Sequence, residues 1–466
     1  MDTASPKSRP AAQGSSSQDR SLIPVGMATI LPHAAKQVRS LESKLLAQLA
    51  RWGYDEIILP TFEYLDVLAP GLEAELLETC YQFVDRTTGR TLLLRPDATA
   101  QVARTVAMGL LGMEIPQRLS YCTSVFRYEP EHAGRGREIF QVGAELIGVA
   151  DAAADSEVLT MLIECLHAIG LPAFTIAIGH VGFMRALMAR SGLSPQGQRR
   201  AEQAAARKDL PRLEEILTGE RVAKSAARAI CEAPELSGRE EVLHRGKKLA
   251  AGEPALTGPL ERLSEVYQSL CSAGHRESLL LDLGEFRGFD YYDGVVFDVF
   301  APGVGSELGG GGRYDHLIGR FGRALPSTGF ALDVDRLFRA LKFPDGAHVS
   351  PHLDYLVVGS RRTIRLVSEI AARLRQGSRR VAQQALTGRD DSLIDNAIIT
   401  GQGQRAGMVV VVGMPGHTRD EVTVIGPICS PVDPRGNGRS RRLSRKKMNV
   451  GMLLKTGDHP RAKGKS

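Results

Sequence analysis

The order of strand-like and helical segments constrains the fold of this chain most strongly. Strand-like segments gather at the two ends of the first 345 residues, and a charged, alanine-rich stretch of helical character separates them. A doubly wound sheet would alternate strands and helices more regularly, so this order predicts one α+β domain with an antiparallel sheet flanked by helices. We expect residues 22–345 to form this core, with a helical insertion at about residues 185–270.

Local patterns define several elements inside the core. Apolar residues at helical spacing predict a helix over residues 36–52, ended by Gly53. The stretch LRPDATAQVAR predicts a turn and then a helix that Asp97 or Thr99 could cap. Near the end of the core, the glycine run GSELGGGGRYD separates two strands, at residues 291–302 and 327–334, and would let a ligand approach the backbone closely.

The segments outside the core differ in composition. Residues 1–21 are polar and rich in Ser, Pro and Gly, with no apolar signal-peptide region, so we expect a disordered leader. Residues 354–428 alternate between strand-like and helical stretches, which predicts a small C-terminal α/β unit. Residues 430–466 are predicted to be a basic, disordered tail.

Charge and cysteine content exclude some classes of protein. The net charge of +6 arises in the tail: residues 435–465 contribute +10, so the remainder carries about −4. An acidic body is poor for a tRNA-binding protein, although phosphate or RNA binding by the tail is an alternative. No apolar run approaches the roughly 20 residues of a membrane span. The six cysteines are scattered without a CxxC pair, which favours a reducing cytoplasm and argues against a metal site.

Polar residues on two predicted strands could form a binding site. Gln141 and Glu145 alternate along one strand and therefore point to one face, where they could hold a ligand bearing an N–H group. Arg127, at the end of the preceding strand, could bind a carboxylate or phosphate. A solvated loop with polar residues on one strand face is the alternative interpretation.

Two further stretches carry candidate binding residues. Asp97 and Thr99 suit a protonated amine, and helix capping is the alternative role for them. In RGFDYY, Arg287 stands close to Tyr291 and Tyr292, whose rings could form a flat wall. The glycine run is not a GxGxxG motif that opens a helix, so a dinucleotide site is not predicted.

The stretch GFALDVDR combines opposite charges. Arg336 is placed to meet an anion, yet Asp333 and Asp335 stand just before it. The stretch alone does not say whether this arginine binds a ligand or pairs with a neighbouring carboxylate.

Taken in order, these motifs resemble the catalytic core of class II histidyl-tRNA synthetases over residues 22–345. LRPDAT, FRYE, GRGRE with Gln141 and Glu145, RGFDYY, GGGRYD and GFALDVDR carry the resemblance. Three stretches, TIAIGHVGFMRALM, KDLPRLEEIL and RPDATAQVAR, are similar to a narrower family, the ATP phosphoribosyltransferase regulatory subunits. These are synthetase paralogues that do not charge tRNA.

The resemblance implies a damaged nucleotide pocket. Arg127 and Arg336 match the synthetase arginines that contact ATP phosphates. However, Asp333 stands where the synthetase has a glycine, and Pro130-Glu131-His132 replaces Arg-Pro-Gln in the loop after FRYE. Added bulk and negative charge would oppose a triphosphate, by up to about 4 kcal/mol for one pair at 4 Å. Asp333 and Arg336 are therefore predicted to form a vestigial nucleotide pocket.

The resemblance also implies a histidine site and its partners. Asp97 and Thr99 would meet the α-amine, and Arg287 the carboxylate. The other residues assigned to the histidine site are Arg127, Gln141, Glu145, Tyr291 and Tyr292. The implied role is a non-catalytic regulatory subunit for the first step of histidine biosynthesis, feedback-inhibited by histidine, dimeric, and bound to a short-form catalytic subunit. No metal or cofactor is expected in this chain. A histidyl-tRNA synthetase that charges tRNA is the alternative.

Overall fold

The computed structural model describes residues 23–110, 112, 114–128, 136–250, 252–284, 291–341, 353–386, 393–428 and 443–455. The chain divides into two compact units, Met1–Lys342 and Phe343–Ser466. The first unit contains the candidate site, and each unit is described by itself.

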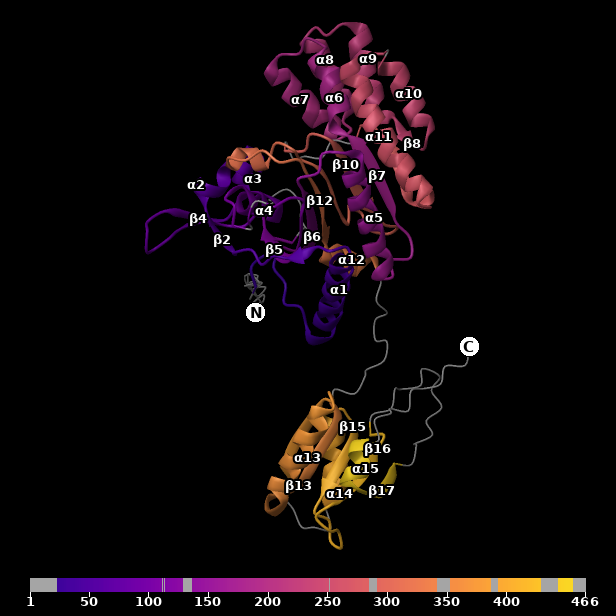
Figure 1. Cartoon of the computed structure of the whole chain (residues 1–466). Helices are drawn as coiled ribbons and strands as arrows, with labels where there is room; N and C mark the ends of the chain where they lie inside the picture. The colour runs from indigo at the N-terminus through magenta and orange to yellow at the C-terminus, as the bar shows by residue number, and fades with distance from the viewer. Residues whose placement is uncertain are drawn as a thin grey trace, which may run out of the picture. The chain divides into compact units, whose positions relative to one another are not determined.

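A nine-stranded sheet forms the centre of the first unit (Figure 1). Neighbouring strands are antiparallel except for the pairs β1–β5 and β7–β9. The predicted α+β class with a largely antiparallel sheet is confirmed. In spatial order the strands are β1 (Asp55–Glu56), β5 (Gln117–Phe126), β6 (Glu138–Ile147), β12 (Ser327–Asp333), β11 (Gly309–Arg313), β10 (Val295–Phe300), β7 (Thr175–His180), β9 (Leu279–Asp282) and β8 (Ser237–Gly238).

Helices cover the two faces of this sheet. Helix α5 (Ala152–Ala168) lies on one face with α1 (Pro32–Arg51), and Glu164 accepts hydrogen bonds from Gln48 and Trp52 of the α1 end. Helix α12 (Val334–Ala340) packs against α1. Helix α4 (Ala98–Ala107) lies on the other face, where Thr99 bonds a side chain of β6. The predicted cap of α4 is confirmed, since Asp97 accepts from the Thr99 N–H.

A three-stranded sheet lies beside α4. It consists of β2 (Phe62–Tyr64), β4 (Thr91–Leu94) and β3 (Gln82–Val84), in the order β2-β4-β3. Two short helices, α2 (Leu65–Leu68) and α3 (Ala74–Glu78), follow β2 in the chain. Gln101 and Arg104 of α4 both bond Glu63, which ties this sheet to the core.

Six helices form the insertion between β7 and β9 (Figure 1). Strand β7 ends at His180, whose Nδ1 accepts from the Gly182 N–H and caps the first of these helices. The helices of the insertion are α6 (Val181–Ala189), α7 (Pro195–Ala206), α8 (Leu210–Gly219), α9 (Lys224–Glu232), α10 (Glu241–Ala250) and α11 (Pro254–Ser272).

The second unit is a five-stranded sheet with helices on both faces. Its strand order is β14 (Val381–Leu386), β13 (Leu353–Ser360), β15 (Ala406–Val412), β16 (Glu421–Gly426) and β17 (Ser444–Asn449). Helices α13 (Ile364–Gln376) and α15 (Val450–Lys455) share one apolar core with the sheet. Helix α14 (Leu393–Gly403) contributes to a second core.

Two expectations about these regions differ from the structure. The tail is not disordered over residues 443–455, because β17 pairs with β16, and Val450 and Leu453 are buried. The glycine run is not only a separator between strands: Gly309–Arg313 is itself β11, in the middle of the sheet. The predicted leader and residues 456–466 lie outside the described residues, and the domain boundaries expected from the sequence stay a prediction.

Glycine is required in β11 because its neighbours approach closely. A Cβ on Gly311 would lie 2.7 Å from the Phe330 Cα and closer still to the Gly329 carbonyl oxygen. We expect Gly311→Ala to lower the free energy of unfolding by about 2 kcal/mol or more. Urea unfolding followed at Trp52, the single tryptophan and a residue of the first unit, measures this.

Gly219→Ala is the matched control. Nothing lies within 4 Å of a Cβ at this exposed end of α8, so the change should leave stability unchanged or raise it by up to about 1 kcal/mol. Equal effects of the two substitutions would contradict the packing explanation.

Candidate functional site

One pocket opens on the face of the sheet that carries α4. The space within it, open solvent included, is about 710 Å³. Strands β6, β11 and β12 form its floor, and the residues around 291 and 314 form one wall. The lining residues are Asp97, Thr99, Arg127, Ile139, Gln141, Glu145, Tyr291, Tyr292, Glu307, Gly309, Gly310, Tyr314, Gly329, Phe330, Ala331, Asp333 and Arg336.

Strand register decides which residue lies beside each polar residue of the floor. Glu145 of β6 pairs with Gly329 of β12, and Gln141 pairs with Asp333. A Cβ on Gly329 would collide with the Glu145 carboxylate. The glycine therefore makes the space in which this carboxylate lies.

Glu145 is buried beneath three hydroxyl groups. Its Oε1 accepts from Thr99 at 2.8 Å and from Tyr121 at 3.3 Å, and its Oε2 accepts from Tyr314 at 2.5 Å. Only 1% of the residue is exposed. Burial raises the pKa of Glu145 to about 8, and the hydrogen bonds from Tyr314 and Thr99 act in the opposite direction. The group is therefore poised to exchange a proton near neutral pH or to accept an N–H from a ligand.

A second carboxylate lies at the start of α4. Asp97 accepts from the Thr99 N–H at 3.1 Å and from the Tyr291 hydroxyl at 3.5 Å. Burial raises its pKa, and the positive charge of Arg127 opposes that shift. Asp97 and Glu145 together make this half of the pocket suitable for a ligand that donates protons or carries a positive charge.

Aromatic rings form the wall beside these carboxylates. Tyr291 and Tyr292 lie 4.6 Å apart between ring centroids, and Tyr314 meets Tyr291 edge to face at 5.9 Å. All three are buried. Such a wall suits a flat ring with polar edges.

The other half of the pocket contains a paired arginine. Arg336 Nη1 donates to the Glu307 carboxylate and to its backbone oxygen, both at 2.6 Å. Its Nε lies 3.1 Å from Asp333 Oδ2, and Gln141 donates to the other Asp333 oxygen at 2.9 Å. Two carboxylates therefore contact this guanidinium. In the stretch GFALDVDR the arginine thus pairs with a neighbouring carboxylate, Asp333.

Nine of the ten predicted site residues line this pocket, and Arg287 lies outside the described residues. Arg127 lines it while its Nε donates to the Pro96 carbonyl at 2.7 Å. Their roles in histidine binding stay a prediction. Pro130, Glu131 and His132 lie outside the described residues as well.

Sequence reasoning missed Glu307 and Tyr314. Both belong to the glycine run. In a strand through this run Tyr314 lies on the face of Gly310, whereas Glu307 falls on the opposite face, so alternation could have indicated Tyr314 but not Glu307. The alternation was hidden because the run was not assigned as a strand.

The described residues hold no cluster of His, Cys, Asp or Glu side chains arranged for a metal ion. Within the same residues, no helix is both long and apolar enough to cross a membrane.

Comparison with known proteins defines the class of the first unit. Residues 26–337 match the family model described as histidyl-tRNA synthetase. A solved structure from Bacillus halodurans, titled ATP phosphoribosyltransferase regulatory subunit/histidyl-tRNA synthetase, is similar with a TM-score of 0.72 and 29% identity. The similarity covers 84% of this chain and 97% of that one. The fold of the first unit is thus that of a histidyl-tRNA synthetase-like protein.

Curated relatives define the family within that class. The ATP phosphoribosyltransferase regulatory subunit of Geobacter metallireducens is 37% identical over 76% of this chain and 81% of its own length. The subunit of the same name from Moorella thermoacetica is also 37% identical, over 78% of this chain and 94% of its own. The chain belongs to the family of ATP phosphoribosyltransferase regulatory subunits.

The buried Glu145 predicts a particular pH dependence of stability. With the pKa raised to about 8 in the folded state from an ordinary value of 4.5, the folded chain keeps a proton that the unfolded chain loses between these values. Stability then falls as pH rises through this window, by up to about 1.4 kcal/mol per pH unit. Glu145→Gln should remove this contribution, so its stability relative to wild type should improve from pH 5 to pH 8.

Urea unfolding followed at Trp52 at pH 5, 6.5 and 8 measures the effect. Glu78→Gln, on the exposed side of α3, is the control and should follow the wild-type profile. A constant difference between Glu145→Gln and wild type across this range would show that Glu145 titrates normally.

Proposed function

We propose that this chain is a non-catalytic regulatory subunit of ATP phosphoribosyltransferase that binds histidine in its pocket and mediates feedback inhibition of the first step of histidine biosynthesis. The catalytic subunit of that enzyme is its partner. The cytoplasm, expected from the scattered cysteines, is part of the same proposal.

One observation carries the non-catalytic part: Arg336 is enclosed by Asp333 and Glu307. A synthetase needs the corresponding arginine to bind ATP phosphates. Here a phosphate would have to displace the Glu307 contact at 2.6 Å and the Asp333 contact at 3.1 Å. It would then lie beside two carboxylates, each worth up to about 4 kcal/mol of repulsion at 4 Å in a partly screened site. Half of one such pair already weakens binding more than tenfold.

The geometry of the opposite half supports histidine as the ligand. Histidine offers an ammonium group and an imidazole ring with N–H donors. Asp97 and Glu145 supply acceptors for these groups, and the three tyrosines supply a wall for the ring. The half of the pocket with Asp97 and Glu145 can bind an amino acid, while the half with Arg336 is closed to a nucleotide. This combination suits a protein that senses histidine and does not join it to ATP.

Feedback follows if histidine favours one state of the assembly over another. An effector shifts an equilibrium only by its difference in affinity for the two states. The proposal therefore requires that the pocket differ between the active and inhibited forms of the complex with the catalytic subunit.

Glu145 should be needed for histidine binding. Glu145→Ala removes a buried acceptor for a charged or N–H-bearing ligand, an interaction worth about 1.5–3 kcal/mol, so the affinity should fall roughly ten- to a hundredfold. Isothermal titration of L-histidine into the full chain, alone and with its catalytic subunit, measures this. Glu157→Gln, which changes a carboxylate paired with Arg118 outside the pocket, should bind normally. Absence of histidine binding by the wild-type complex would overturn the histidine proposal.

The regulatory role has its own assay. A short-form ATP phosphoribosyltransferase should co-purify with this chain and form more phosphoribosyl-ATP in its presence, and histidine should suppress the gain. The chain alone should give no histidine-dependent ATP–pyrophosphate exchange. Positive exchange would favour the alternative, a histidyl-tRNA synthetase.

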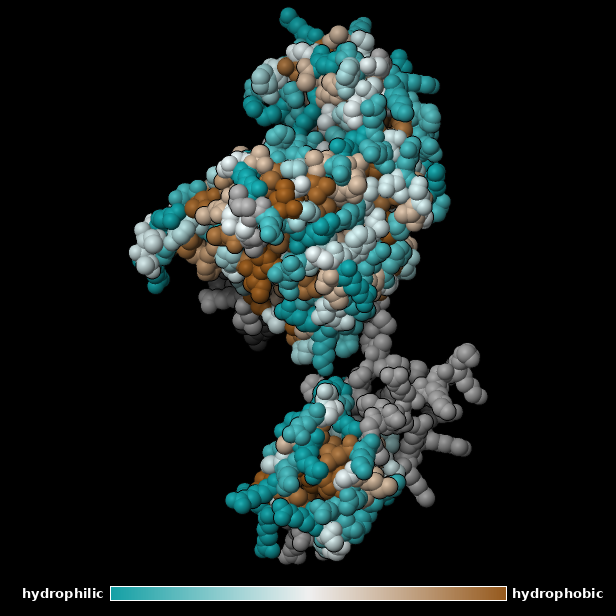
Figure 2. All heavy atoms as spheres, in the orientation of Figure 1, coloured by the Kyte–Doolittle hydropathy of each residue, from teal (hydrophilic) through white to brown (hydrophobic). Residues whose placement is uncertain are grey.

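An exposed apolar surface supports dimer formation. Ile58 is 91% exposed, and Phe62, Met108 and Leu110 are each more than half exposed. The stretch containing Ile58 runs beside α4, because Gln101 donates to the Pro60 carbonyl. Figure 2 shows hydrophobic residues gathered over the region of β2, β5 and α4. A contiguous apolar surface of this kind is typical of a protein interface, and a second copy of the chain is the proposed occupant.

A charge at Ile58 should separate the dimer. Ile58→Asp places a carboxylate in the proposed interface and should yield monomers in size-exclusion chromatography with light scattering. Ile399→Asp changes an isoleucine that is 66% exposed on the second unit and should leave the mass unchanged. A dimer that survives Ile58→Asp would contradict this interface.

A further inference from the structure

Two arginines of the helical insertion contact residues that connect to the pocket. Arg185 of α6 donates its Nη1 to the backbone oxygen of Tyr292 at 2.7 Å, and Tyr292 lines the pocket. Arg262 of α11 lies behind the sheet, 3.8 Å from Asp155. The two helices pack together where Pro259 of α11 meets Gly182 of α6. The insertion thus contacts the surroundings of the pocket at two separate points.

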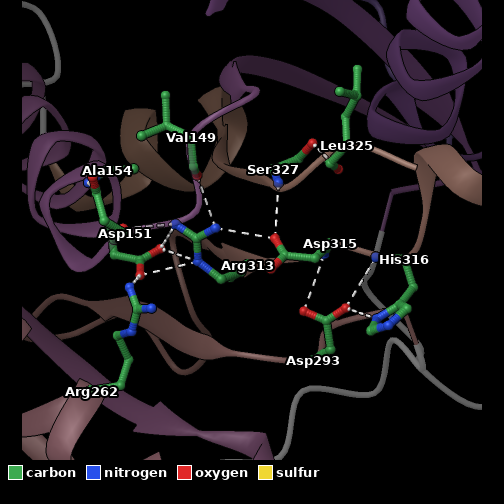
Figure 3. Close-up of polar contacts among 11 residues, drawn as sticks. Val149, Asp151, Ala154, Arg262, Asp293, Arg313, Asp315, His316, Leu325 and Ser327 are labelled. Atoms are coloured by element: carbon green, nitrogen blue, oxygen red, sulfur yellow. Dashed lines mark hydrogen bonds and ion pairs between the residues drawn. The ribbon is translucent and has the colours of Figure 1, made fainter. Parts of the chain in front are cut away.

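Asp155 connects Arg262 to the floor strand β11. Arg313, the last residue of β11, places its Nε 3.0 and 3.1 Å from the two Asp155 oxygens, and both residues are buried. The same guanidinium donates to the backbone oxygens of Val149 and Asp151, and Figure 3 shows these contacts around Arg313 with Arg262 nearby. Tyr314, the next residue after Arg313, bonds Glu145 inside the pocket.

The contact of Arg262 is incomplete. Its Nη1 is buried, and no atom of the described residues accepts a hydrogen bond from it. At 3.8 Å, Asp155 Oδ2 is too far for one. A shift of about 1 Å between α11 and α5 would bring the pair to hydrogen-bonding distance. Because an unpaired buried N–H is unfavourable, a small movement of α11 toward α5 that closes this bond would be favoured.

We infer that Arg185 and Arg262 couple the occupancy of the pocket to the position of the helical insertion. A ligand that contacts Tyr292 or Tyr314 displaces the groups that Arg185 and Arg313 hold. Arg185 transmits this to α6 directly, and the Arg313–Asp155 pair transmits it to Arg262 and α11. Both arginines are positioning residues that do not touch the ligand. The identity of the ligand, histidine, rests on the proposed function, but the coupling itself does not.

The coupling has a reciprocal consequence. If a ligand changes the preferred position of the insertion, then a protein seated on the insertion changes the affinity for that ligand by the same factor. The insertion would then be the element through which the catalytic subunit and the pocket influence each other.

A nearby ion pair offers a matched control. Arg190 follows α6, and its Nη2 lies 2.8 Å from Glu253, which precedes α11. This pair also joins the two helices, but its side chains are about half exposed and neither lines the pocket. If Arg185 and Arg262 only held α6 and α11 together, Arg190→Gln would have the same effect as their replacement.

Hydrogen–deuterium exchange of the full chain tests the inference without a ligand. Tyr314→Phe removes the hydroxyl that bonds Glu145 and perturbs the pocket from within. In the wild-type background it should change exchange rates in α6 and α11 by about fivefold or more, the lower range of allosteric effects. In Arg185→Gln and Arg262→Gln backgrounds the response should shrink, and in the Arg190→Gln background it should persist. The inference is overturned if α6 and α11 do not respond to Tyr314→Phe, or respond undiminished in the two arginine variants.

A second arm adds L-histidine and separates this inference from the proposed function. Histidine should protect α6 and α11 in wild type and in Arg190→Gln, and should do so less in Arg185→Gln and Arg262→Gln. If histidine fails to bind while Tyr314→Phe still reaches the insertion, the proposed ligand is wrong and the coupling stands. If histidine binds but neither perturbation reaches the insertion, the coupling is wrong and the ligand stands.

Discussion

The close approach of backbone in the middle of the large sheet is the constraint on which the pocket depends. Strand β11 contains four glycines in a row between β10 and β12, and Gly143 and Gly329 continue this lack of side chains across the floor. A side chain at Gly329 would fill the space of the Glu145 carboxylate, and one at Gly143 would meet the Tyr121 ring and hydroxyl. The glycines thus leave a depression in which buried carboxylates and tyrosine hydroxyls can meet.

Electrostatics divides this depression into two unlike halves. On one side, Asp97 and Glu145 are buried among hydroxyl donors, with their pKa values raised by burial. On the other side, Arg336 is already satisfied by Asp333 and Glu307. A neutral or cationic donor is favoured in the first half, and a polyanion is opposed in the second. The division suits the proposed function, in which the pocket binds histidine and does not bind ATP.

Sequence patterns predicted the features that depend on residues close together in the chain. They missed the features that depend on contacts between segments far apart in the chain. Asp97 as a helix cap and the shared face of Gln141 and Glu145 follow from spacing along the chain, and both are found in the structure. The strand β11 was missed because four glycines have little intrinsic preference for a strand, so its neighbours β10 and β12 stabilise it.

Glu307 and the C-terminal strand show the same limit. Glu307 meets Arg336 only after the sheet brings residues 29 positions apart together. The basic composition around residue 445 indicated a solvated tail, yet Met448 packs against the core of the second unit. The coupling contacts of Arg185 and Arg262 likewise join elements that no local pattern connects.

The three-residue cluster of Arg336, Asp333 and Glu307 also bears on how such a protein can evolve. Replacing either acid alone leaves the arginine held by the other, and replacing the arginine leaves the buried Asp333 and the partly exposed Glu307 without their counter-charge. Freeing this arginine for an anion therefore requires at least two substitutions, because a change at one acid alone leaves the guanidinium paired.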